Sequence, residues 1–241
     1  MSREITKDCD KLIYYLKEYD LTPLCNNNEY IIDLKSMHKK VYGYLLFTTE
    51  LEQQNQSISC INDMVIDYFK ESGSDMMQSV FSWANGSYKS SKLLLRSSIE
   101  TFVKACIGND DQEVFEEKSL YKLFDTAKDH SYFSGDPREK YFERIHNSYK
   151  VLCMTAHSAP TIDLASISAM KILPRYDAKA SKEFSKLFTS TIEAMLSTAF
   201  LNYHSTVNNM HLFNRSIFLS SLSLTSKREI SEYISEQAMR N

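Results

Sequence analysis

The chain has 241 residues, 43% of them hydrophobic, which is typical of a globular protein with a substantial core. Its 28 basic and 31 acidic residues nearly cancel, which excludes an overall positive field that would attract nucleic acid or an anionic membrane. Only 5 Gly and 4 Pro are present, whereas sheet proteins of this size need many tight turns built from those residues. We therefore expect an all-α protein with long helices.

Helices are predicted from apolar periodicity and capping residues. Asp136 followed by Pro137 marks the clearest helix start, and Ser226 with Glu229 forms a capping-box pattern before the last helix. The segment 159–179 is the longest connection, and we expect a loop with at most one short helix there, acting as a mobile lid or hinge. In chain order, the predicted helices are 4–19, 29–54, 57–71, 74–107, 111–129, 137–158, 180–212 and 226–239.

The predicted helices suggest an N-terminal helical segment, residues 1–72, that packs on a helical bundle formed by residues 73–241. The chain shows no internal repeat or low-complexity tract, and we expect the two parts to form one compact unit.

Two features bear on the cellular compartment. No apolar stretch approaches the roughly 20 residues that span a bilayer, and residues 1–10 are charged where a secretory signal would be apolar. The five cysteines are odd in number and include no CxxC pair, so neither a disulfide framework nor a zinc knuckle is indicated. We expect a cytoplasmic protein with reduced thiols and no membrane contact.

The predicted helix 74–107 carries an ion pair in an unusual place. A helical wheel at 100° per residue puts Arg96 and Glu100 at the edge of the apolar arc rather than on the polar face. These two residues are four positions apart, which is the spacing of a helical ion pair. The pair is either a helix-edge contact with partly buried stems or a binding site, and we take Arg96 and Glu100 as candidate binding residues.

A stripe of polar residues follows the core edge of the predicted helix 137–158. His146, Lys150, Cys153 and His157 recur at spacings that keep them on one side of the helix. Cys153 and His157 could supply two metal ligands, but a closed zinc site needs four and no partner pair is recognisable, so we expect no metal site. The histidines are either satisfied edge residues or general acids and bases, since an unperturbed imidazole titrates near neutrality.

Two segments of the chain carry a family resemblance. Residues 84–88 (ANGSY), followed by residues 93–100 (LLLRSSIE), resemble a helix common in bacterial proteins of the higher-eukaryote-and-prokaryote nucleotide-binding (HEPN) type. Residues 149–158 (YKVLCMTAHS) are similar to the histidine-bearing helix of that group. The resemblance covers about residues 75–158.

The resemblance implies an HEPN-like helical bundle, often dimeric, here with additional N- and C-terminal helices. Members of the group include RNA-cleaving toxins, phage-defence effectors and catalytically silent relatives. The cleaving members carry an arginine shortly before a histidine, and the two act together on RNA across a dimer. In this chain His157 follows Lys150 instead, and lysine lacks the planar donor fork that arginine presents to a phosphate.

Three functions remain open from these residues. The first is a non-catalytic protein that acts through RNA or a protein partner in phage defence or a toxin–antitoxin setting. Such a protein would form a homodimer or be a subunit of a complex. No cofactor is expected. The second is a metal-independent ribonuclease with Lys150 and His157 as a variant catalytic pair and with Arg96 and Glu100 orienting or binding the substrate; His146 is a further candidate binding residue. The third is a structural subunit, for which the uncharged apolar stretch 216–224 (SIFLSSLSL) would either cover its own bundle or contact a partner.

Overall fold

The protein is described by a computed structural model, which covers residues 20–58, 60–157 and 174–240, together with residues 10, 11, 13, 14 and 18. Regular structure in these residues is helical, without any strand, which confirms the predicted all-α class. The elements in chain order are α2 (Thr22–Cys25), α3 (Asn28–Ile58), α4 (Asp63–Ala84), α5 (Tyr88–Ile107), the 3-10 helix η1 (Gln112–Phe115), α6 (Leu120–Asp129), α7 (Arg138–His157), α9 (Ala178–Asn202), α10 (His204–Asn209), α11 (Leu212–Ser220) and α12 (Leu224–Arg240). The HEPN-like assignment stays a prediction.

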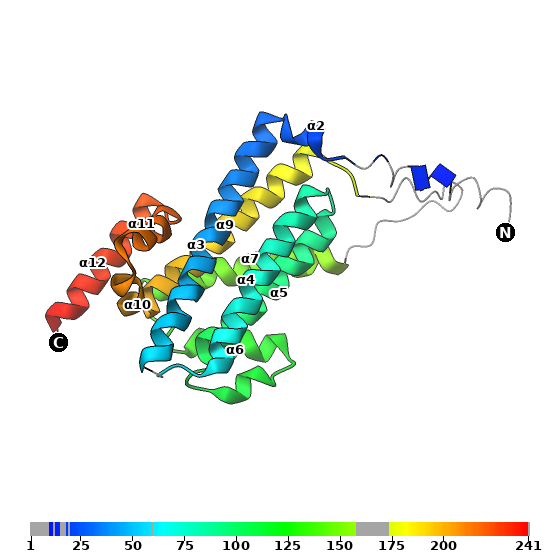
Figure 1. Cartoon of the computed structure of the whole chain (residues 1–241). Helices are drawn as coiled ribbons and strands as arrows, with labels where there is room; N and C mark the ends of the chain where they lie inside the picture. Colours follow the sequence, from blue (N-terminus) through cyan, green and yellow to red (C-terminus); the bar gives the residue numbers. More distant parts are fainter. Residues whose placement is uncertain are drawn as a thin grey trace.

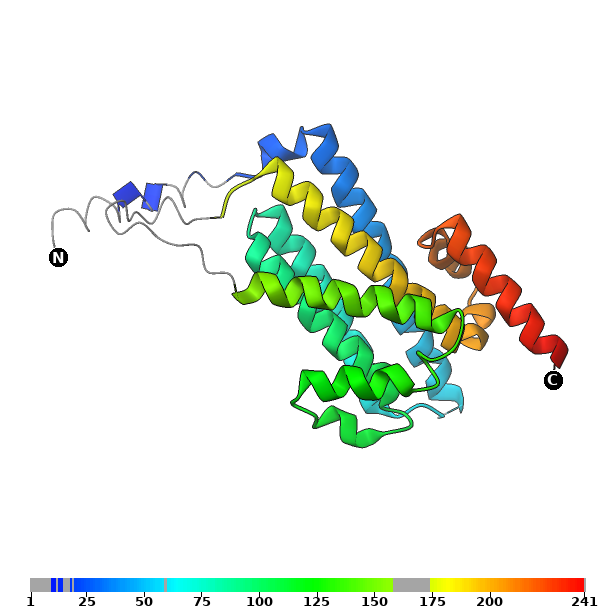
Figure 2. The same cartoon turned by 180° about the vertical axis from the view of Figure 1, so that it is seen from behind.

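Five long helices form a closed ring around the core. Going round the ring, α3 packs on α4, α4 on α5, α5 on α7, α7 on α9, and α9 again on α3. Figures 1 and 2 show α3 and α9 side by side, with α4 and α5 on one side of the molecule and α7 crossing on the other. The short helix α6 covers one end of α5 and α7, whereas α10, α11 and α12 lie to one side of the ring.

An aromatic cluster joins the ring to the C-terminal helices. Phe47 of α3 is fully buried, and its ring lies 5.7 Å from the rings of Phe69 and Tyr203. Its ring also lies 6.2 Å from that of Phe218 in α11. Because aromatic side chains bury large apolar areas, this cluster stabilises the attachment of α11 to the ring.

Helices α4 and α5 approach closely because serines line their interface. The Ser72 hydroxyl donates to the carbonyl of Ser98 at 2.8 Å, and the Ser79 hydroxyl donates to the carbonyl of Ser91 at the same distance. All four serines are buried. Their small side chains let the backbones come together, and the hydrogen bonds satisfy hydroxyls that would otherwise be costly to bury.

The predicted break between helices 57–71 and 74–107 is wrong. Gly73 lies inside α4, where a Cβ atom would come within 2.9 Å of Leu45 Cδ2, so this glycine permits close packing of α4 on α3. The chain turns instead at Gly86, whose φ of 74° lies in the left-handed region. The expected boundary between residues 1–72 and 73–241 therefore falls inside a continuous helix.

Two other predicted helices are interrupted. The helix predicted over 180–212 ends at Asn202, because Tyr203 leaves the helical conformation with φ −117° and ψ 36°. The segment 111–129 contains η1 and α6 with a short turn between them, and Ser119 caps α6 by accepting from Lys122 N. Periodicity continued across both interruptions, which is why the sequence did not reveal them.

The C-terminal helix begins earlier than predicted. Ser226 lies inside α12, and its backbone N–H donates to Ser223 Oγ at 3.1 Å, so Ser223 rather than Ser226 acts as the cap. In the apolar stretch 216–224, Phe218 and Leu222 are buried. This stretch therefore packs back on its own bundle, through the contact of α11 with α3.

Two expectations concern residues that the structure largely leaves out. Most of the predicted helix 4–19 and most of the predicted loop 159–179 lie outside the described residues. Within the described part of the chain, none of the helices has an apolar stretch of the length that a bilayer crossing requires.

Candidate functional site

A groove of about 750 Å³ opens between α5, α6 and α7. This volume lies within the usual range of ligand-binding pockets. The floor and walls are mainly aromatic and aliphatic, and charged side chains stand at the rim. The groove is lined by Arg96, Leu120, Tyr121, Phe124, Asp125, Lys128, His146, Tyr149, Lys150, Cys153 and Met154.

Helix α6 forms one wall because its apolar side faces α7. Phe124 is buried, with its ring centroid 4.4 Å from that of Tyr149 and 4.9 Å from that of His146. The Phe124 and His146 planes differ by only 10°, so the two rings are stacked. Tyr121, one turn earlier on α6, is 81% exposed and leaves an aromatic surface open to a ligand.

Arg96, Glu100 and Tyr149 form a hydrogen-bonded cluster at the back of the groove. Arg96 Nε donates to Glu100 Oε1 at 2.9 Å, and the Tyr149 hydroxyl donates to the same oxygen at 3.0 Å. The Arg96 guanidinium carbon lies 5.5 Å from the centre of the Tyr149 ring. The two charged side chains are only 23% and 24% exposed, which confirms the predicted pair at the edge of the core.

The cluster favours a charged Arg96 and a neutral Tyr149. Burial lowers the pKa of Arg96, but its hydrogen bonds to Glu100 and Tyr149 outweigh burial and raise the pKa above the usual value. Burial, the Cys153 thiol and the Glu100 carboxylate raise the pKa of Tyr149 far above its ordinary range. Tyr149 is therefore a hydrogen-bond donor at neutral pH and holds Glu100 in place.

His146 lies between two lysines at the rim. Burial, followed by the charges of Lys150 and Lys128, lowers the pKa of His146. The imidazole is consequently neutral at neutral pH, and it can either accept or donate a hydrogen bond. Lys128 and Lys150 supply the positive charge at this end of the groove.

A second hollow of about 340 Å³ adjoins the groove along α7. It shares Lys128, His146 and Lys150 with the groove, and its other lining residues include Glu139 and Glu143. The rim of α7 therefore changes from acidic to basic along the helix, and the larger groove continues beyond the basic part.

The structure brings together three of the five residues singled out from the sequence. Arg96, His146 and Lys150 all line the groove, and Glu100 lies directly behind it, bound to Arg96. The helix α7 ends at His157, but the side chain of His157 lies outside the described part of the structure. The proposed catalytic pair Lys150 and His157 therefore stays a prediction.

Sequence reasoning missed the residues that α6 contributes to the groove, which are Leu120, Tyr121, Phe124, Asp125 and Lys128. Their spacing gives α6 a strongly amphipathic pattern, but such a pattern does not show which helix lies opposite it. The described residues contain no group of three or more His, Cys, Asp or Glu side chains that could hold a metal ion. The described residues therefore offer no additional ligand for a metal ion bound by Cys153 and His157.

Sequence comparisons place the chain in no family. No model of a protein family matches it, and neither the curated proteins nor the solved structures compared with it give a significant match.

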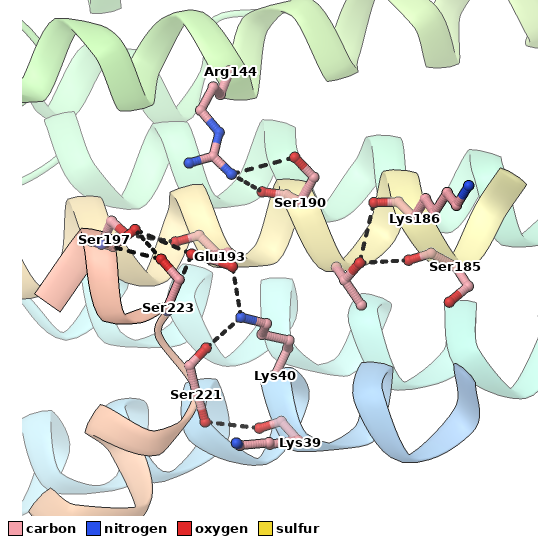
Figure 3. Close-up of polar contacts among 12 residues, drawn as sticks. Lys39, Lys40, Arg144, Ser185, Lys186, Ser190, Glu193, Ser197, Ser221 and Ser223 are labelled. Atoms are coloured by element: carbon pink, nitrogen blue, oxygen red, sulfur yellow. Dashed lines mark hydrogen bonds and ion pairs between the residues drawn. The ribbon is translucent and has the colours of Figure 1, made fainter. Parts of the chain in front are cut away.

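A second polar cluster lies away from the groove and fixes the C-terminal helices (Figure 3). Lys40 Nζ of α3 donates to Glu193 Oε2 of α9 at 2.9 Å and to the carbonyl of Ser221 at 2.5 Å. The other Glu193 oxygen accepts from the Ser223 backbone N–H at 3.2 Å and from the Ser226 hydroxyl at 3.1 Å. Because every member has a partner within the protein, we interpret this cluster as a structural clamp.

The Arg96 cluster leads to a prediction about stability. We expect Arg96→Ala to lower the free energy of unfolding by about 1–2 kcal/mol, because Glu100 loses a charged donor in a partly buried place. Lys92→Ala, one turn earlier on the same helix, serves as the control and should lower the free energy of unfolding by clearly less. Urea unfolding of both variants measures the difference in the free energy of unfolding. Equal unfolding midpoints for the two variants would show that the ion pair does not stabilise the fold.

Proposed function

We propose that the protein acts by binding a segment of a protein partner in the groove between α5, α6 and α7, without catalysing a reaction. The observation that carries this proposal is the lining of the groove, in which Leu120, Tyr121, Phe124 and Met154 offer apolar and aromatic surface inside a charged rim. Such lining is typical of sites that receive apolar side chains of a partner, where aromatic contacts supply much of the binding energy.

The charge of the rim supports a protein partner over nucleic acid. Three basic and three acidic side chains line the groove and the hollow beside it: Arg96, Lys128, Lys150, Asp125, Glu139 and Glu143. Binding to phosphates is driven by an excess of positive charge, which a balanced rim does not provide. Homodimer formation and membership of a larger complex are both compatible with this proposal.

RNA is the second candidate, because Lys128, His146 and Lys150 lie together beside exposed aromatic surface. Single-stranded nucleic acids bind where bases stack on aromatic rings next to cations. The HEPN resemblance also favours RNA, and it is the sole support for a role in phage defence or toxin–antitoxin systems. A ribonuclease would need Lys150 and His157 to act as a pair, and a purely structural subunit would need no ligand in the groove.

The test places a photo-crosslinking amino acid at position 121 in cells and identifies what is captured. We expect a protein, and we expect Tyr121→Ser to weaken the purified complex at least about tenfold because an aromatic anchor is lost. Phe213→Ser, which changes a 68% exposed aromatic residue on α11, is the control and should leave affinity unchanged. Calorimetric titration measures both.

The same experiment decides between the candidates. If the captured molecule is RNA, the protein-partner proposal fails; Lys150→Ala should then weaken binding and reduce its salt dependence, as for one lost phosphate contact. In that case His157→Ala should impair any cleavage of total RNA while leaving the melting temperature nearly unchanged. If the captured molecule, whether protein or RNA, binds the Tyr121→Ser variant as tightly as the natural protein, both candidate functions are contradicted.

A further inference from the structure

The groove and the adjoining hollow form one elongated surface along α7. They share three lining residues, and together they extend from Glu139 near the start of α7 to Met154 near its end. At a rise of about 1.5 Å per residue, this stretch of helix is about 22 Å long. A ligand that fills the whole surface is therefore a polymer segment rather than a small metabolite.

The chemistry of this surface changes in a fixed order along its length. Glu139 and Glu143 occupy the first end, and both are exposed. Lys128 and Lys150 follow in the middle, beside His146, which is neutral at neutral pH.

The far end is apolar. Tyr121 and Met154 are both exposed there, with Leu120 and Phe124 between α6 and α7. Among the described residues that line the groove, Asp125 is the one carboxylate. A matching ligand must therefore present basic groups, acidic groups and an apolar anchor in that order.

We propose that the surface recognises a peptide segment with a large apolar residue for the end near Tyr121, an acidic residue for Lys128 and Lys150, and a basic residue for Glu139 and Glu143. This inference rests on the proposed function and specifies the partner's chemistry. A nucleic-acid strand does not meet the requirement, because its phosphates would face two carboxylates at the first end. A peptide can reverse its charge along the chain, which a uniform phosphate backbone cannot.

The charge order assigns a separate role to each part of the surface. The apolar end provides most of the affinity, because burying an aromatic or aliphatic anchor removes apolar area from water. The two charged parts set the direction in which the peptide lies, because the reversed peptide would place like charges together.

The probe is a displayed library of random peptides about 15 residues long, selected on the whole protein. We expect the enriched peptides to share an apolar anchor, then an acidic residue, then a Lys or Arg. Tyr121→Ser should abolish their binding, and Glu143→Lys should weaken it at least about tenfold. Replacing the peptide's basic residue by Glu should restore affinity for the Glu143→Lys variant.

Glu116→Lys, a charge reversal at an exposed position in the turn between η1 and α6 that lines neither the groove nor the adjoining hollow, is the matched control and should bind the peptides as the natural protein does. Peptides that need Tyr121 but show no charge order, or that bind Glu143→Lys unchanged, would overturn the inference and leave the proposed function standing. Failure to enrich any peptide that depends on Tyr121 would overturn both. Circular dichroism of each variant establishes that it is folded before it is compared.

Discussion

Replacing Glu193 with alanine is expected to lower the free energy of unfolding by about 3–5 kcal/mol, because it leaves a buried ammonium group without its counter-charge. The Lys40 and Glu193 side chains are only 12% and 16% exposed. The substitution also removes the acceptor of the Ser223 backbone N–H and of the Ser226 hydroxyl. Chemical unfolding followed by circular dichroism measures the loss.

The control for this prediction is Glu232→Ala. Glu232 also forms an ion pair, with Arg228, but its side chain is 60% exposed, so its loss should cost less than about 1 kcal/mol. The double variant Lys40→Met with Glu193→Leu should recover much of the stability, because no charge is then left buried. Equal losses for Glu193→Ala and Glu232→Ala would contradict the clamp.

The clamp also has a pH signature. Despite its partial burial, the Glu193 carboxyl has a pKa lowered from 4.5 to about 2 by Lys40 and Ser223. Because the folded pKa lies below the unfolded one, the stabilisation is complete above pH 4.5 and disappears as the pH falls towards 2. The stability difference between the natural protein and Glu193→Gln should shrink across that window. Burial lowers the pKa of Lys40, which keeps the net contribution of the pair below the value that the Glu193 shift alone would give.

Phe47→Ala is expected to lower the free energy of unfolding by about 3–5 kcal/mol, because it opens a cavity in the centre of the molecule. Phe47 contacts the rings of Phe69, Tyr203 and Phe218, which belong to three different parts of the chain. Thermal unfolding by calorimetry measures the effect.

Phe213→Ala is the control for the core substitution. It removes the same side chain from an exposed place on α11 and should change the stability by no more than about 0.5 kcal/mol. A small effect of Phe47→Ala would mean that the aromatic cluster collapses to fill the space.

The glycines of the chain show how much of the structure could be predicted from the sequence. The all-α class follows from the scarcity of glycine and proline, but the predicted helices leave a break at residues 72–73, which include Gly73, and run without a break through Gly86. A glycine serves either to permit close approach of two helices or to adopt a positive φ, and both look alike in sequence. Only the packing of α3 against Gly73 distinguishes them.

The candidate site was predicted in part for a similar reason. Helical periodicity located Arg96, Glu100, His146 and Lys150 at the edges of their own helices, and the structure places them at or behind one groove. Periodicity carries no information about which helix lies opposite, so the contribution of Phe124 was not foreseen. The Lys40 and Glu193 pair was missed because its members are distant in sequence and meet only in the folded chain.

The closed ring of helices has a consequence for the order in which the chain folds. The α4–α5 hairpin is local in sequence and can form early during synthesis. The contact between α3 and α9 joins segments near opposite ends of the chain, so the ring cannot close until α9 has left the ribosome. Until then the apolar side of α3 that α9 later covers is open to solvent, and nascent chains that stall before α9 should be substrates for chaperones.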